Sequence, residues 1–211
     1  GTDRELRRRA FEQYYRSYIE LDNTIAATYF GNVKKDVFFM RARKYESCLQ
    51  KALEGEDVDV CVYRNLIDAV HAGLPSMHRY IALRKKVLGY EQQHMYDIYA
   101  PLVEDADLKL PYEEACELVI RGLAPLGKEY CGLLRKGFAE GWVDVCETTG
   151  KRSGAYSTGI FGLHPFVLLN YQQTTHDIFT IAHEMGHSLH TYYSNASQPY
   201  AKADYRIFVA E

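Results

Sequence analysis

The 211-residue sequence has no long hydrophobic run, no marked excess of charge of either sign and no closely spaced cysteines. No apolar stretch approaches the roughly 20 residues needed to span a bilayer, so we expect no membrane partner. The 25 basic and 28 acidic side chains leave a net charge of −3, which gives no support for binding nucleic acid. With 47% hydrophobic and 25% charged residues, the composition is typical of a globular protein.

The cysteines are odd in number, far apart in the sequence and contain no CxxC pair. They are Cys48, Cys61, Cys116, Cys131 and Cys146. This usage is typical of reduced thiols in the cytosol, where a buried cysteine behaves as a small hydrophobic residue. We therefore expect a cytoplasmic protein without a disulfide framework.

The first two thirds of the sequence carry the periodicity of amphipathic helices. Phe11, Tyr14, Tyr18 and Leu21, for example, recur at three- and four-residue steps. Gly73-Leu74-Pro75 has the composition of a helix end. Helical periodicity covers residues 3–53, and within this range a second run begins near residue 33. Further helices are expected at 60–72, 76–88, 111–123 and 126–136, the last of which is closed by Gly137. A connection is expected at 101–107.

After residue 140 the pattern changes to short strand-like segments separated by glycine and proline, at 143–145, 154–157 and 166–171. A long helix is expected from about 176 to 193. Thr174 or Thr175 is its expected N-cap, and Asp177 lies in its first turn, where the helix dipole favours an anion. The predicted fold class is mainly α: a multi-helical protein with a small β-sheet next to the last long helix.

That helix contains His183-Glu184-Met185-Gly186-His187, an HExxH motif. Residues four apart lie on nearly the same helix face, so His183 and His187 can bind one metal ion. Neutral imidazoles suit Zn²⁺, and Glu184 can reach a water bound to it. Gly186 costs about 1 kcal/mol relative to alanine within a helix, which predicts close approach of a neighbouring strand or of substrate.

A third metal ligand distinguishes the classes of zinc peptidase. The extended metzincin motif would need glycine at 190 and histidine at 193, but the sequence has His190 and Tyr193. The acidic candidates after the motif are Asp204 and Glu211. Glu211 follows the apolar residues 207–210, as expected for a ligand on a second helix, whereas Asp204 is better interpreted as a cap. His190 could line the site, although a core histidine is the favoured interpretation.

The stretch 183–190 resembles the signature of the thimet oligopeptidase family of zinc metallopeptidases. Flanking segments resemble, within that family, oligoendopeptidase F: 31–37, 94–97, 151–157, 164–171 and 198–211. The resemblance implies a largely helical, two-lobed peptidase whose deep channel admits unfolded peptides. It also implies that His183, His187 and Glu211 hold one Zn²⁺ per chain, with Glu184 as the general base.

By the same resemblance, residues 1–110 form a helical region lining the channel and residues 111–211 the catalytic region. Gly154-Ala155-Tyr156-Ser157 resembles the edge strand that pairs with the substrate backbone, with a simple hairpin as the alternative. His190 is the remaining candidate for substrate binding. Because the family continues past the third ligand, we expect residues 1–211 alone to be inactive and the C-terminal remainder to act as a partner segment.

The sequence thus predicts a zinc-dependent endopeptidase that hydrolyses short, unstructured oligopeptides. The alternative, from a different functional class, is a non-catalytic helical binding or scaffold domain in which His183 and His187 are structural.

Overall fold

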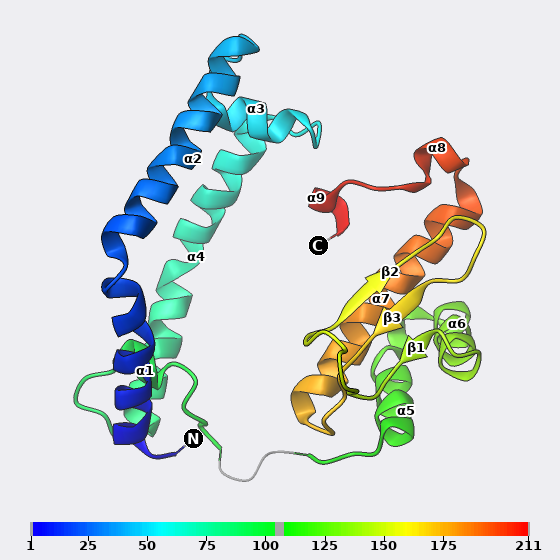
Figure 1. The fold of residues 1–211 in the computed structure, drawn as a ribbon. Coiled ribbons are helices and arrows are strands. Elements are labelled where there is room, and N and C mark those ends of the chain that lie inside the picture. Colours follow the sequence, from blue (N-terminus) through cyan, green and yellow to red (C-terminus); the bar gives the residue numbers. More distant parts are fainter. Residues whose placement is uncertain (1, 104–107, 211) are drawn as a thin grey trace. The chain divides into compact units, whose positions relative to one another are not determined.

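The computed structural model describes residues 2–103 and 108–210 and divides the chain into two compact units, Gly1–Glu104 and Asp105–Glu211 (Figure 1). The expected connection at 101–107 therefore lies partly outside the described residues. Within those residues, no helix is long and apolar enough to cross a membrane. The assignment of residues 1–110 to a channel wall and 111–211 to catalysis stays a prediction.

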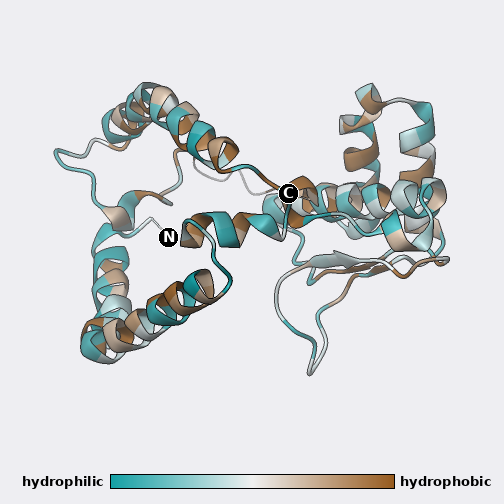
Figure 2. Cartoon of the chain, turned by 90° about the horizontal axis from the view of Figure 1, so that it is seen from above, coloured by the Kyte–Doolittle hydropathy of each residue, from teal (hydrophilic) through white to brown (hydrophobic). Residues whose placement is uncertain are grey.

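The first unit is built from helices along which hydrophobic and hydrophilic residues alternate (Figure 2). The helices are α1 (Arg4–Ile19), α2 (Asp22–Ala42), α3 (Cys48–Glu54), α4 (Val60–Val87) and the short 3₁₀ helix η1 (Met95–Asp97). Side chains cap three of them at the N-terminus, since Asp3, Ser47 and Asp59 each accept a backbone N–H. The helical character predicted for 3–53 is confirmed. The second helix, however, begins at Asp22 and not near residue 33, and residues 43–47 separate it from α3.

The predicted helix end at Gly73-Leu74-Pro75 is wrong, because α4 continues through all three residues. Pro75 has no N–H to donate to the carbonyl of His71, which normally weakens a helix interior. Residues 71–80 are all exposed, so water can satisfy that carbonyl. Exposure therefore allows a helix that the sequence pattern alone would divide.

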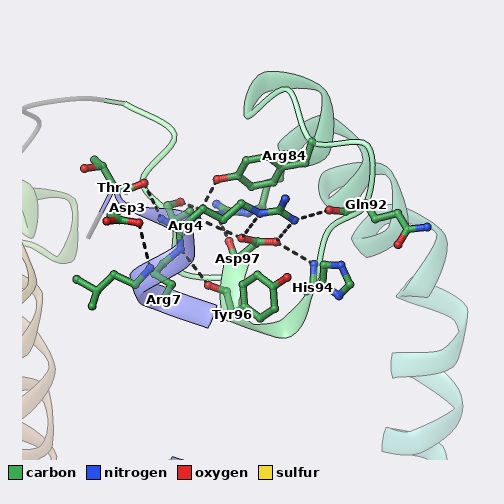
Figure 3. Close-up of polar contacts among 12 residues, drawn as sticks. Thr2, Asp3, Arg4, Arg7, Arg84, Gln92, His94, Tyr96 and Asp97 are labelled. Atoms are coloured by element: carbon green, nitrogen blue, oxygen red, sulfur yellow. Dashed lines mark hydrogen bonds and ion pairs between the residues drawn. The ribbon is translucent and has the colours of Figure 1, made fainter. Parts of the chain in front are cut away.

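A buried carboxylate joins the two ends of the first unit (Figure 3). Asp97 is fully buried and accepts hydrogen bonds from Arg4 at 3.1 and 2.9 Å, from Arg7 at 3.2 Å and from the His94 backbone N–H at 3.0 Å. Arg84, also buried, donates to the backbone carbonyl of Asp97 at 3.3 Å. The start of α1 is thereby fixed to the segment that follows α4.

Burial alone would raise the pKa of Asp97, but the hydrogen bonds from Arg4, the His94 backbone and Arg7 outweigh it and lower the pKa to about 2. The unfolded chain has the ordinary value near 4. The cluster therefore contributes stability that is fully present above about pH 5 and is lost as the pH falls through 2.

We predict that Asp97→Asn lowers the free energy of unfolding by about 2 kcal/mol at pH 7, because both arginines lose a charged acceptor. The difference between the variant and the unaltered protein should shrink below pH 4. Urea titrations between pH 2 and 7 measure both effects. Glu12→Gln, which removes an exposed ion pair with Arg8, is the control and should cost less than about 0.5 kcal/mol. Equal losses in the two variants would contradict this account.

The second unit combines helices with a small sheet. Its elements are α5 (Tyr112–Gly122), η2 (Ala124–Leu126), α6 (Lys128–Ala139), β1 (Val143–Asp144), β2 (Tyr156–Thr158), β3 (Phe166–Leu168), α7 (Thr175–Ser197), α8 (Tyr200–Ala203) and α9 (Ile207–Ala210). The predicted fold class is confirmed. The predicted end of α6 at Gly137 is wrong, because the helix continues to Ala139.

The sheet has the strand order β1-β3-β2. β1 pairs with β3 in parallel, and β2 pairs with β3 antiparallel, with Ser157 opposite Val167. Within the described residues β2 has one partner strand, so its other edge lies open. An open edge is a place where an extended peptide can add.

The core of the second unit forms where α5, α6 and the sheet pack against α7. It consists of Ala115, Val119, Ile120, Leu134, Trp142, Val167, Leu169, Ile178, Ile181, Met185 and Leu189. The close approach of α6 to α7 depends on Gly137, where a Cβ would lie 2.8 Å from Met185 Cε and 2.9 Å from Trp142 Cε3. The glycine at 137 is therefore explained by close packing and not by a helix end.

We predict that Gly137→Ala destabilises the protein by about 1–3 kcal/mol through overpacking against Met185 and Trp142. Gly132→Ala is a matched control in the same helix, because a Cβ there has no neighbour within 4 Å among the described residues. That variant should gain up to about 1 kcal/mol of helix propensity. Thermal unfolding distinguishes the two, and equal shifts would contradict the packing argument.

Candidate metal and catalytic site

Helix α7 places the HExxH motif between the core and the solvent. The predicted N-cap is confirmed at Thr174, whose hydroxyl accepts the Asp177 N–H at 3.2 Å, while Asp177 accepts the Thr174 N–H at 2.9 Å. Met185 and Leu189 face the core, and His183 lies on the exposed side. The helix thus has a fixed beginning and a buried face, which together set the direction of the histidines.

The two histidines converge on one point. Their Nε2 atoms lie 3.0 Å apart, and their rings are perpendicular. Two nitrogens bound to a tetrahedral Zn²⁺ at 2.0–2.1 Å would be about 3.3 Å apart, so a small rotation of either ring fits the pair to the metal. The donor chemistry and the spacing of His183 and His187 therefore suit zinc.

Within residues 2–103 and 108–210, no third histidine, cysteine, aspartate or glutamate joins this pair. The predicted third ligand, Glu211, lies outside the described residues. Its neighbour in sequence, Ala210, lines the same cavity as His183 and His187. Asp204, the other acidic candidate, is the C-cap residue of α8.

Glu184 is buried beside the histidines, with 7% of its surface exposed. It lines two cavities, one of about 260 Å³ shared with His183 and His187 and another of about 300 Å³ that reaches His176 and Thr180. In the described part of the chain its carboxylate has no hydrogen-bond partner among protein groups. The carboxylate is thus available to a water or a substrate atom.

The predicted substrate-binding segment borders the same space. Ala155, Tyr156 and Ser157 line the cavity with the two histidines, and Gly154 lines the neighbouring one. The Ser157 and Ser188 hydroxyls lie 2.8 Å apart, which joins β2 directly to α7. The structure brings these four residues together with the motif, and their binding of substrate stays a prediction.

Asn170 is a functional candidate that the sequence pattern did not reveal. Its side-chain amide donates to the carbonyls of Arg152 and Gly154, both at 2.8 Å. Gly154 has a φ of +90°, a conformation that favours glycine. Asn170 therefore fixes the backbone turn that leads into β2.

Tyr205 and Thr191 were also missed. The Tyr205 ring stacks on His190 with centroids 3.8 Å apart, and its hydroxyl lies 2.7 Å from Thr191 Oγ1. Tyr205 and Thr191 line the histidine cavity, with His190 behind Tyr205. Thr191 follows His187 by one helical turn, so helix spacing could have identified it. Nothing in the sequence pattern signals Tyr205.

Gly186 does not have the close neighbour that its cost in a helix suggests. A Cβ at this position would meet no atom within 4 Å among the described residues. The predicted approach of a neighbouring strand is therefore wrong for the described residues, because Ser157 of β2 contacts Ser188 and Gly159 lies against Thr191 instead. Approach by substrate stays a prediction.

Comparison with known families assigns the chain to a peptidase family. The profile of Peptidase family M3 matches residues 1–211. The chain belongs to this family. Its relatives include oligopeptidase PepF of Bacillus subtilis, 48% identical over 211 residues, and an oligoendopeptidase F homolog of Lactococcus lactis, 44% identical over 211 residues. All of this chain is covered, but only 32% and 35% of those proteins, so it spans about a third of their length.

Solved structures resemble the chain as well. A structure from Chlamydophila abortus superposes with a TM-score of 0.87 at 41% identity, covering 100% of this chain and 35% of that one. Oligoendopeptidase-F from Enterococcus faecium gives 0.61 at 30% identity, with 91% and 28% covered. The resemblance to oligoendopeptidase F predicted from the motifs is confirmed.

We predict that Asn170→Ala loosens the turn before β2, because two carbonyls lose their donor. Backbone amides of β2 (Tyr156–Thr158), which pairs with β3, should exchange with deuterium at least about 10-fold faster, as expected when about 1–2 kcal/mol of local stability is lost. Gln172→Ala is the control, since among the described residues the Gln172 side-chain amide donates only to the exposed carboxylate of Glu147. If the exchange rates are unchanged in Asn170→Ala, the Asn170 side chain does not fix the turn before β2.

Proposed function

We propose that the whole protein is a zinc-dependent endopeptidase acting on short, unstructured peptides. The observation that carries the proposal is the convergence of the His183 and His187 nitrogens beside Glu184 and an open strand edge. Membership of a peptidase family supports it. The five free cysteines are consistent with a cytoplasmic location, which we propose as well.

His183, His187 and Glu211 would hold one Zn²⁺ per chain. The metal, when bound, supplies an acidified water and a Lewis acid that polarises the scissile carbonyl. The spacing of the two imidazole nitrogens supports the first two ligands. For Glu211 the support is its position in sequence, directly after Ala210 in the wall of the cavity.

Glu184 would act as the general base. Its carboxylate removes a proton from the attacking water and then delivers it to the nitrogen of the departing amine, so that the residue returns to its starting state. Burial beside the histidines keeps the carboxylate near the reacting water, and the absence of a competing protein hydrogen bond in the described region leaves both oxygens available.

The edge of β2 would hold the substrate backbone in extended form. A peptide paired there gains hydrogen bonds from backbone groups that are independent of its sequence, which suits a peptidase with many substrates. Because only an extended segment can pair, folded proteins would be poor substrates. Gly154, Ala155, Tyr156 and Ser157 are the proposed contacts, with His190 supporting the cavity through Tyr205.

The test separates metal binding from proton transfer in the whole protein. Glu184→Gln should keep zinc near one equivalent and lower kcat by at least about 100-fold, because it removes the base and no ligand. His183→Ala should lose most of the zinc. Glu211→Gln should weaken zinc retention during dialysis against a chelator. Elemental analysis and cleavage of a quenched fluorescent peptide measure the outcomes.

His164→Ala is the control, since His164 stacks on Trp142 away from the cavity, and it should retain zinc. Full zinc content in His183→Ala, with no peptide cleavage by the unaltered protein, would favour the scaffold interpretation, in which the histidines are structural. Loss of zinc in Glu184→Gln would make Glu184 a ligand and not the base.

A further inference from the structure

A third cavity, of about 690 Å³, continues from the histidine cavity along α7. The two share Ser157, Thr191 and Tyr205 in their walls. The volume falls within the range of roughly 300–1,000 Å³ found for ligand pockets. The mechanism proposed above makes no use of this space.

The direction of β2 places this cavity in line with an incoming peptide. Ala155 borders Glu184, Ser157 contacts Ser188, and Gly159 lies against Thr191, so β2 and α7 run in the same direction. Thr191 and Asn195 lie about 6 and 12 Å along the helix from His187. Since an extended chain advances about 3.3 Å per residue, the cavity lies two to four residues from the scissile bond.

The walls of the cavity combine aromatic surface with one carboxylate. Phe161 and Tyr200 form an edge-to-face pair with centroids 5.4 Å apart, and both are exposed. Asp204, an exposed residue, lines the same cavity, and no ion pair or hydrogen bond engages its carboxylate among the described residues. Lys202 and Arg206 are its nearest cations in sequence, and neither forms an ion pair with it in that part of the chain.

We propose that this cavity is a specificity pocket for a basic side chain of the peptide substrate, with arginine preferred over lysine. The apolar stem and the planar guanidinium would lie against Phe161 and Tyr200, and the charge would pair with Asp204. This inference rests on the proposed function, because it needs a peptide on β2. The occupant is a substrate side chain because the cavity is continuous with the proposed reaction site and carries a carboxylate that forms no ion pair with any described residue.

Binding tests the pocket separately from catalysis. In the whole protein carrying Glu184→Gln, fluorescence anisotropy compares labelled peptides that differ only at the positions two to four residues to either side of the central bond. Peptides with arginine at one of these positions should bind at least about 10-fold more tightly than those with leucine, and those with glutamate more weakly than either. Adding Asp204→Asn should reduce the arginine-to-leucine ratio to below about 2.

Three further variants exclude simple explanations. Asp204→Lys should reverse the preference, so that glutamate peptides bind more tightly than arginine peptides. Glu117→Gln, at an exposed ion pair with Arg135, removes the same charge elsewhere and should leave the ratio unchanged. Phe161→Ala should weaken the arginine and leucine peptides together, because both lose apolar contact.

An arginine-to-leucine ratio that is near 1, or that Asp204→Asn leaves intact, overturns the pocket whether or not the enzyme cleaves peptides. A preference for leucine or phenylalanine peptides overturns the proposed role of the Asp204 carboxylate and assigns the cavity to apolar side chains. If the pocket behaves as expected while Glu184 proves not to be the base, only the proposed mechanism fails, since binding is measured without turnover.

Discussion

The second unit depends on the burial of one face of α7. Ile181, Met185 and Leu189 are almost fully buried, and each such side chain contributes about 1.5–3 kcal/mol. Because these residues recur at four-residue steps, burying them fixes the rotation of the helix about its axis. His183 and His187 then have to face the opposite side, and Glu184 is held between the core and the cavity. The rigidity that a metal site needs thus comes from ordinary hydrophobic packing.

The sheet adds a second constraint to that helix. The Ser157–Ser188 contact and the close approach of Gly159 to Thr191 hold β2 along α7, and Asn170 fixes the turn before the strand. Because these contacts fix the position of β2, its outer edge can stay unpaired and accessible to a peptide. The edge, the histidines and Glu184 therefore form one arrangement, in which a peptide bond can be placed beside a water.

The sequence predicted the start of α7 and its cap well because hydrophobic period, N-cap residue and motif all agree there, but the helix runs to Ser197 and not to about residue 193. The sequence-based prediction failed at positions where tertiary packing or solvent exposure determines whether a helix continues. Gly137 and Pro75 both carry helix-ending signals, but close packing requires the first and solvent exposure permits the second. Tyr205 was missed because its stacking on His190 depends on how the chain turns through α8, which no periodicity encodes. The strands were located, but all three were predicted too long and β2 ends one residue later than expected, since two or three paired residues leave little pattern.

The central claim is that His183 and His187 bind one zinc ion together. Zinc X-ray absorption on the purified whole protein tests it directly. The account predicts a shell of nitrogen and oxygen atoms at about 2.0–2.1 Å, with outer scattering from two imidazole rings that is lost from His187→Ala. A sulfur shell at about 2.3 Å, or an imidazole signal that persists unchanged in that variant, would contradict it.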